Sequence, residues 1–118
     1  MAEMYWIIAI VRPQAIEAVR AELLDMGCLA MTVTECSGFG RQYGKVEVYR
    51  GAEYRVELLP KVRIEVGCTR GELNQAIEAI CKGARSGHEG KIGDGKIFVF
   101  EMGESVRIRT GETGRDAL

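Results

Sequence analysis

The fold is decided by the uncharged run Met4-Tyr5-Trp6-Ile7-Ile8-Ala9-Ile10-Val11, which predicts a strand buried on both faces. The run is far too short to cross a bilayer, and it lacks the basic start and small-residue cleavage site of a signal peptide. Pro13, which a first helical turn tolerates, follows it. Apolar residues then recur three and four positions apart and predict an amphipathic helix, ended by Gly27: Ile16, Val19, Leu23 and Met26.

The remainder of the chain repeats the pattern. Ala30–Cys36 is rich in β-branched residues and predicts a second strand, and alternation over Val62–Val66 predicts a third. Thr69 and Glu72 have the spacing of a capping box, which predicts the start of a second amphipathic helix with apolar positions Leu73, Ala76, Ile77, Ile80 and Ala84. Ile97–Phe100 predicts a fourth strand, and Ser105–Arg109 a short final one.

The order strand-helix-strand, long loop, strand-helix-strand is typical of a ferredoxin-like doubled βαβ domain of the α+β class. Such a domain has four strands in one antiparallel sheet and both helices on one face. The other face would be bare, although strand residues such as Tyr5, Ile7 and Val99 are apolar. We therefore expect the sheet to bury its open face against further copies of the chain.

Composition limits the possible functions. With 118 residues, 47% hydrophobic and 28% charged, the chain is expected to form a single globular domain over residues 1–118. Its 16 basic and 17 acidic side chains leave a net charge of -1, which argues against a nucleic-acid coat protein and a polybasic membrane-surface module. No pair among Cys28, Cys36, Cys68 and Cys81 has CxxC spacing, so reduced thiols in a cytoplasmic protein are favoured over a zinc site.

The most informative segment for chemistry is the glycine-rich run Gly87–Lys96. Backbone N–H groups of closely spaced glycines can converge on an anion, and Lys96 would add a positive charge. Gly90–Lys96 matches the start of a P-loop, but Ile97 replaces the Ser or Thr that holds Mg²⁺, and a strand follows in place of a helix. The residues fit a phosphate site and an ordinary glycine turn equally well.

Two arginines offer a second candidate anion site. Arg107 and Arg109 lie two apart on a predicted strand, so their guanidinium groups would share one face and suit a polyphosphate. Ordinary surface arginines on an edge strand are the simpler explanation of the pair viewed alone.

Other polar residues are less specific. Arg41 and Gln42 sit between glycines and could reach over a ligand, and Glu65 could pair with a lysine such as Lys96. Lys61 could contact a ligand or could be an ordinary solvated surface lysine. Tyr54, flanked by charge, is a candidate for modification or partner contact, or an incidental surface tyrosine.

Catalytic groups are scarce, so we expect a binding protein that is not an enzyme. The chain has a single histidine, His88, and shows no Ser-His-Asp pattern. A small phosphoryl-transfer enzyme using Lys96 would lack both the Ser or Thr and a catalytic base. An RNA-recognition-type module shares the βαββαβ order, but Ser37-Gly38-Phe39-Gly40-Arg41 lacks its basic start and its second aromatic residue.

Several segments, in order over nearly the whole chain, resemble the PII nitrogen-regulatory signal-transduction family: Thr32–Glu35, Gly38–Gln42, Tyr49–Tyr54, Leu59–Val62, Gly90–Val99 and Arg107–Glu112. The resemblance implies a trimer with ATP or ADP in each cleft between subunits, and 2-oxoglutarate bound together with Mg²⁺-ATP. It also implies a T-loop at about residues 40–57, a B-loop at about 82–96 and a C-terminal loop at about 105–118. Members are non-enzymatic regulators of nitrogen, carbon and energy metabolism that control targets through the T-loop.

The resemblance also implies roles for residues. The adenine would lie by Thr32 and Gly67, and Glu65 would pair with Lys96 when ATP is bound. The implied nucleotide contacts are Thr32, Gly40, Arg41, Gln42, Glu65, Gly67, Gly90, Lys91, Ile92, Gly93, Asp94, Gly95 and Lys96, with Arg107 and Arg109 of the neighbouring subunit. The implied 2-oxoglutarate contacts are Gln42, Tyr43, Gly44, Lys61 and Gly93, and Gln42 would also hold Mg²⁺ with the ATP phosphates and 2-oxoglutarate.

Partner contacts follow in the same way. Arg50 matches the arginine that some members insert into an ammonium channel, and Tyr54 matches a tyrosine that others carry uridylylated. The implied targets are an ammonium channel or a nitrogen-assimilation enzyme or regulator, with no nucleic acid and no direct membrane insertion. Three features depart from the family pattern: Ser86–Glu89 lengthens the link before Gly90 by about three residues, Gly67 replaces a larger aliphatic residue, and Tyr43 replaces a common lysine.

Overall fold

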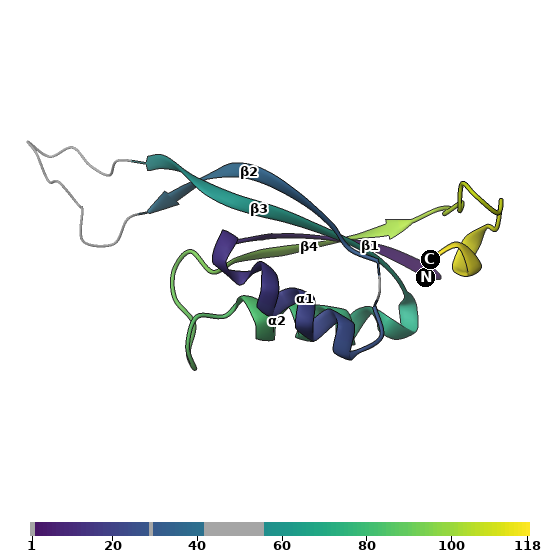
Figure 1. The fold of residues 1–118 in the computed structure, drawn as a ribbon, viewed down its shortest axis with the longest axis horizontal. Helices are drawn as coiled ribbons and strands as arrows, with labels where there is room; N and C mark the ends of the chain where they lie inside the picture. Colours follow the sequence, from purple (N-terminus) through teal and green to yellow (C-terminus); the bar gives the residue numbers. More distant parts are fainter. Residues whose placement is uncertain (1, 29, 42–55) are drawn as a thin grey trace, which may run out of the picture.

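The computed structural model describes residues 2–28, 30–41 and 56–118. Its main elements are β1 (Met4–Val11), α1 (Ile16–Asp25), β2 (Thr32–Arg41), β3 (Val56–Thr69), α2 (Leu73–Ala84) and β4 (Gly95–Met102). The strands form one antiparallel sheet in the order β2-β3-β1-β4, and both helices cover the same face of it (Figure 1). The predicted ferredoxin-like α+β architecture is therefore confirmed.

The hydrophobic core lies between the sheet and the two helices. β1 is paired on both sides, with Ile7 opposite Val66 of β3 and Val99 of β4. Its uncharged sequence suits this central position, because both neighbours shield its backbone from water. The largest fully buried side chains come from two strands, β1 and β3, and from both helices: Ile7, Val11, Val19, Leu23, Val62, Ile64, Val66 and Ile80.

Local signals place both helices as the sequence predicts. Thr69 and Glu72 form the capping box, in which Glu72 Oε1 accepts from the Thr69 backbone N–H at 3.0 Å and from its hydroxyl at 2.8 Å. α1 and α2 pack closely at Gly83, where a Cβ would lie only 2.6 Å from Val19 Cα. None of the described helices is long and apolar enough to cross a membrane.

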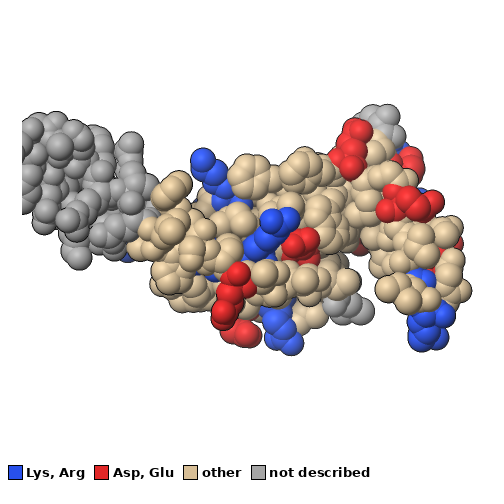
Figure 2. Space-filling model, turned by 90° about the horizontal axis from the view of Figure 1, so that it is seen from above, with Lys and Arg blue, Asp and Glu red and all other residues tan. Residues whose placement is uncertain are grey.

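The sheet face opposite the helices is open and largely uncharged. Phe98 and Phe100 of β4 are 47% and 50% exposed there, because Ile97 takes the helix-facing position between neighbours in the pleat. Figure 2 looks onto this face and shows a predominantly uncharged surface with a few basic and acidic side chains near its middle. A group of exposed aromatic residues on one face is typical of surfaces that mediate protein–protein contacts.

Two predicted strand boundaries need correction. β2 runs on to Arg41 and β3 begins at Val56, so both strands extend well beyond the predicted 30–36 and 62–66. The predicted strand Ser105–Arg109 is wrong. That segment instead folds back on itself: the backbone N–H of Arg107 donates to Glu112 O at 2.8 Å, and only Val106 makes an isolated bridge, to Thr113. The segment forms a turn in place of the predicted strand, and Gly111 permits this turn because it adopts a positive φ of 74°.

Candidate functional site

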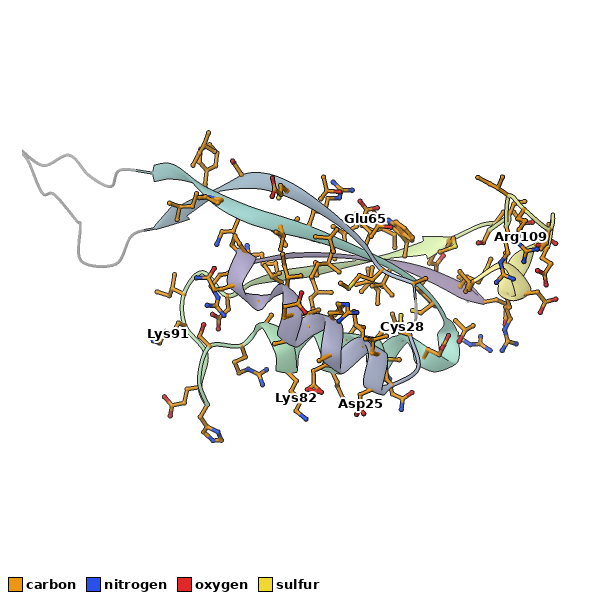
Figure 3. The ribbon with its side chains drawn as sticks, viewed as in Figure 1. Asp25, Cys28, Glu65, Lys82, Lys91 and Arg109 are labelled. Carbon is orange, nitrogen blue, oxygen red and sulfur yellow. The ribbon has the colours of Figure 1, made fainter. Side chains whose placement is uncertain are left out.

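The glycine loop ahead of β4 is organised by the carboxylate of Asp94. Asp94 Oδ2 accepts hydrogen bonds from the backbone N–H groups of Ser86, at 2.9 Å, and Lys91, at 2.8 Å. Asp94 Oδ1 accepts a further bond from the Ser86 hydroxyl. These bonds join the two ends of the segment 87–90, so the extra residues of the link project from a closed base. Figure 3 shows Lys91 on this loop, beside the ends of the helices.

Arg12 ties the same loop to the body of the domain. Its Nε lies 3.5 Å from Asp94 Oδ1, and its Nη2 donates to the main-chain oxygen of Ala84, at the end of α2, at 3.3 Å. The role of Arg12 was not predicted from the sequence, because only the pairing of Val11 with Gly95 brings the end of β1 to this loop. Ser86 was noted as part of the longer link, but its bonds to Asp94 were not predicted. The basic residue just before Pro13 was the available signal.

The protonation of Asp94 reflects these contacts. Partial burial alone would raise its pKa, but hydrogen bonds from Ser86 and Lys91, together with the charge of Arg12, outweigh that effect and lower the pKa to about 2. Asp94 is therefore a carboxylate at physiological pH. Its oxygens accept hydrogen bonds from the N–H groups of Ser86 and Lys91, and these bonds fix the conformation of the loop at its base.

Gly95 marks the point where the loop enters the sheet. Its φ is 120°, a conformation that L side chains rarely adopt, and a Cβ there would collide with the main-chain oxygen of Ile10. The glycine lets the loop approach β1 closely and turn directly into β4. Within the glycine run noted in the sequence, the glycine at position 95 is therefore required by the backbone geometry.

An open cleft of about 760 Å³ lies on one side of the loop. Its walls come from β1, β2, β3 and β4, and they include Arg12, Gly38, Phe39, Lys61, Gly93 and Lys96. Lys61 Nζ donates to Gly93 O at 3.0 Å, which brings together two predicted 2-oxoglutarate contacts. Three basic side chains border one cleft, so its electrostatics favour an anion.

Glu65 has a partner that the sequence analysis did not name. Its Oε1 accepts from Arg63 Nε at 3.0 Å, and both side chains rise from the open face of the sheet, where Figure 3 shows Glu65. The Glu65–Lys96 pair was expected with ATP bound, and it is not among the contacts of the described residues in this structure. Arg63 stands in register with Ile10 and Lys96 across the sheet, so it adds a missed cation near the predicted nucleotide.

The two predicted phosphate-binding arginines lie at the other end of the domain. Arg107 Nη1 contacts Glu112 Oε1 at 2.9 Å, and its Nη2 donates to the main-chain oxygen of Leu118 at 3.2 Å. Arg109 is exposed, and Figure 3 shows it at the opposite end of the molecule from Lys91. Within one copy of the chain, these arginines cannot share a ligand with the glycine loop.

The other predicted positions divide into two groups. Thr32 and Gly67 lie on β2 and β3, with Thr32 paired to Glu65, while Gly40 and Arg41 end β2. Gln42, Tyr43, Gly44, Arg50 and Tyr54 fall outside the described residues. Within the described ranges, no group of three or more His, Cys, Asp or Glu side chains is arranged to hold a metal ion.

Comparison with known proteins gives a consistent result. Residues 4–112 match the family model described as nitrogen regulatory protein P-II. A nitrogen regulatory protein P-II of Pasteurella multocida is 52% identical over 110 residues, covering 93% of this chain and 96% of the relative. One from Mesorhizobium japonicum is 54% identical with the same coverage.

Solved structures agree with the sequence relatives. Arabidopsis thaliana PII bound to citrate has a TM-score of 0.80 and 34% identity, over 99% of this chain and 94% of that one. The GlnK-ATP complex of B. subtilis has a TM-score of 0.77 and 28% identity, over 98% of each chain. The chain therefore belongs to the nitrogen regulatory protein P-II family, whose members are signal-transduction regulators and not enzymes.

Proposed function

We propose that this regulator senses energy and carbon/nitrogen status by binding ATP or ADP and, together with Mg²⁺-ATP, 2-oxoglutarate. It acts as a homotrimer in the cytoplasm, where its four free cysteines stay reduced. Its targets in nitrogen metabolism are an ammonium channel or a nitrogen-assimilation enzyme or regulator, and it contacts them through the T-loop, residues 40–57.

The observation that carries this proposal is the separation of the two candidate phosphate sites. β4 connects them: it begins at the glycine loop and ends at Met102, just before the segment that holds Arg107 and Arg109. A strand of this length keeps its ends about 24 Å apart. Arginines at one end can therefore complete the site at the other end only by reaching into a neighbouring copy of the chain.

The open sheet face supplies the surface for that assembly. Phe98 and Phe100 are exposed on it and have no covering element among the described parts of the chain. Burying two half-exposed aromatic side chains per copy favours association by several kcal/mol, on the order of 25 cal/mol per Å² of apolar surface. The same contact brings the C-terminal segment of one copy beside the glycine loop of another in the proposed trimer.

The register of the sheet fits an extended nucleotide. Lys96 is level with Ile10 and Arg63, whereas Gly67 is level with Trp6, four residues further along β1. Measured along the strands, the proposed adenine contact Gly67 therefore lies about 13 Å from the level of Lys96. The other proposed adenine contact, Thr32, pairs with Glu65 and lies about 7 Å from that level. The glycine loop, residues 90–96, would bind phosphates through backbone N–H groups other than those of Lys91 and Asp94, which are bonded within the loop. Arg107 and Arg109 of the next copy would lie opposite.

Lys61 supports the second ligand. It borders the cleft of about 760 Å³ and already contacts a carbonyl of the glycine loop, at Gly93. A carboxylate of 2-oxoglutarate entering there would pair with its ammonium group. Gln42, Tyr43 and Gly44 would complete this site, and Gln42 would help to hold the Mg²⁺ that bridges 2-oxoglutarate and the ATP phosphates.

Such a bridge makes 2-oxoglutarate binding depend on the nucleotide, because the metal needs oxygen ligands from both molecules. Isothermal titration calorimetry tests this with 2-oxoglutarate added to the protein alone, with Mg²⁺-ADP and with Mg²⁺-ATP. Heat is expected only in the third titration. The variant Lys61→Met should bind Mg²⁺-ATP normally and lose most of the 2-oxoglutarate heat. Equal 2-oxoglutarate binding in all three conditions would contradict the proposal.

The partner contacts are tested separately. In extracts supplied with Mg²⁺-ATP, proteins retained by the immobilised regulator should differ with and without 2-oxoglutarate. Arg50→Ala and Tyr54→Ala should reduce that retention without changing nucleotide binding. Retention that ignores both 2-oxoglutarate and the two substitutions would show that the T-loop is not the contact.

A further inference from the structure

Gly67 leaves a gap on the open face that other residues of the same chain fill. Its neighbours in β3, Val66 and Cys68, are buried beneath the helices, so the side-chain direction of Gly67 is toward the open face. A Cβ at Gly67 would lie 3.1 Å from Leu118 Cδ2 and 3.3 Å from Met102 Cε. The Leu118 side chain therefore occupies the space that a larger residue at position 67 would take.

Several contacts hold Leu118 in this position. Its main-chain oxygen accepts a hydrogen bond from Arg107 Nη2 at 3.2 Å, and Arg107 is itself fixed by Glu112 at 2.9 Å. Residues 114–117 form a 3₁₀ turn, and the Leu118 N–H donates to Arg115 O at 3.3 Å. Leu118 is thus placed by its own segment and packs onto the sheet as a half-buried side chain.

We propose that Leu118 occupies the base subsite of its own chain, and that a bound nucleotide must displace it. This inference rests on the proposed function, which puts the adenine beside Thr32 and Gly67. Two groups cannot fill one space, so the fraction of molecules ready to bind is the fraction in which Leu118 has left Gly67. The apparent affinity for nucleotide is reduced by that fraction.

The displacement has a second effect, because Leu118 and the proposed phosphate ligand Arg107 are directly bonded. When Leu118 leaves, the Nη2 of Arg107 loses its main-chain acceptor and becomes available to another oxygen. In the proposed trimer, Arg107 serves the nucleotide of the neighbouring copy. Clearing the base subsite of one copy therefore prepares the phosphate subsite of the next, which couples the sites positively.

Leu118 should obstruct the base of the nucleotide but not its phosphates. Inorganic tripolyphosphate has no base and can bind at the glycine loop without moving Leu118. ATP must move it. Trp6 reports the difference, since it is the single tryptophan and its Cε3 would lie 3.6 Å from a Cβ at Gly67, next to Leu118.

The test compares wild type, Leu118→Ala, Leu118→Met and Ile108→Ala. Leu118→Ala empties the subsite, Leu118→Met keeps it filled, and Ile108 is a matched control because it is 98% exposed in the same segment. Each protein is titrated with ATP, ADP and tripolyphosphate, and both calorimetry and Trp6 emission are recorded. Circular dichroism checks that all four are folded.

Leu118→Ala is expected to tighten ATP and ADP binding about three- to tenfold. Tripolyphosphate binding should not change, because the substitution removes only the side chain and the main-chain oxygen at position 118 still accepts from Arg107. The Trp6 emission of this variant without ligand should differ from that of ligand-free wild type, because the side chain next to the indole ring is shortened. Leu118→Met and Ile108→Ala should behave as wild type. Unchanged or weaker ATP binding by Leu118→Ala, with wild type binding normally, would overturn the inference alone. Failure of every protein to bind ATP would instead overturn the proposed function on which it rests.

Discussion

Asp94 is bonded to Ser86 twice, through the Ser86 backbone N–H at 2.9 Å and through its hydroxyl. The contact spans eight positions of the chain and closes the loop ahead of β4 at its base. A carboxylate that accepts hydrogen bonds from inside a glycine loop stabilises one conformation of a segment that would otherwise have many. The shape of the candidate anion site therefore depends on a residue whose oxygens accept hydrogen bonds from Ser86 and Lys91 of the chain itself.

Replacing Asp94 with Asn should disorder this loop, because the amide offers one acceptor where the carboxylate offers two and carries no charge for Arg12. We expect ATP affinity to fall about tenfold and unfolding free energy to fall by about 1–2 kcal/mol. Calorimetry and urea denaturation measure the two effects. Asp116→Asn, in the exposed C-terminal turn, is the control and should change neither.

The lowered pKa of Asp94 also predicts a dependence of stability on pH. Its pKa is about 2 in the folded protein, below the ordinary value of 3.8, so the ionised form is stabilised by folding. That contribution is fully present above about pH 4 and is lost as the pH falls toward 2. Urea midpoints measured between pH 5 and pH 2 should fall less steeply in Asp94→Asn than in wild type. Parallel slopes would mean that Asp94 does not carry this effect.

Mixing two defective variants tests whether the nucleotide site is shared between copies. Lys96→Gln removes a cation beside the glycine loop, and Arg109→Gln removes one at the other end of the chain. Each variant alone should bind ATP about ten- to a hundredfold more weakly, the cost of a lost charge-assisted hydrogen bond. After joint unfolding and refolding, mixed trimers should recover some tight sites, in which an intact loop meets an intact arginine. Mixtures no better than either variant would argue for a site within one copy.

Gly83 should tolerate no side chain, because α1 and α2 meet there. A Cβ at Gly83 would lie 2.6 Å from both Val19 Cα and Val19 N, which are backbone atoms that cannot turn aside. Alanine is the better helix former by about 1 kcal/mol, but forced separation of two packed helices costs about 1–3 kcal/mol. Gly83→Ala should therefore lower the unfolding free energy. Gly71→Ala, whose Cβ would meet nothing closer than 4.0 Å, should leave it nearly unchanged.

The Cys68 thiol should be unreactive in the folded protein. Burial, with a smaller contribution from the negative charge of Glu72, raises its pKa to about 11. Because the thiolate is the reactive form, labelling by a disulfide reagent at pH 8 should spare Cys68 until denaturant is added. Peptide mapping by mass spectrometry identifies the labelled cysteines. Rapid labelling of Cys68 without denaturant would show that this end of β3 opens readily.

The sequence predicted the parts of the fold that depend on local patterns. The uncharged run at Ile7, the capping box at Thr69 and the apolar stripes of both helices each correspond to an observed element. The final strand over Ser105–Arg109 was wrong, since alternation alone does not reveal that Glu112 folds back to bond Arg107. The full extent of β2 and β3 was also missed, because glycines near Gly38 suggested a loop where the two strands pair.

Contacts of the candidate site that join distant segments of the chain could not be predicted from the sequence. The glycine run identified the loop, but the roles of Arg12 and Arg63 depend on which strands become neighbours in the sheet. No local pattern carries that information. The packing of Leu118 against Gly67 was not predicted either. These residues lie 51 positions apart in the sequence, and no local pattern indicates the turn that brings them together.

The long hairpin of β2 and β3 has a mechanical consequence. β1 pairs with β3 only over Val62–Thr69, so residues 56–61 have β2 as their single partner and form an arm beyond the sheet (Figure 1). Two-stranded ribbons twist easily. The arm is about 17 Å long, so a swing of 10° at its root, where Lys61 contacts Gly93, carries its tip through about 3 Å. A small rotation of β2 and β3 at the cleft therefore produces a larger displacement at the end of the arm near Arg41 and Val56.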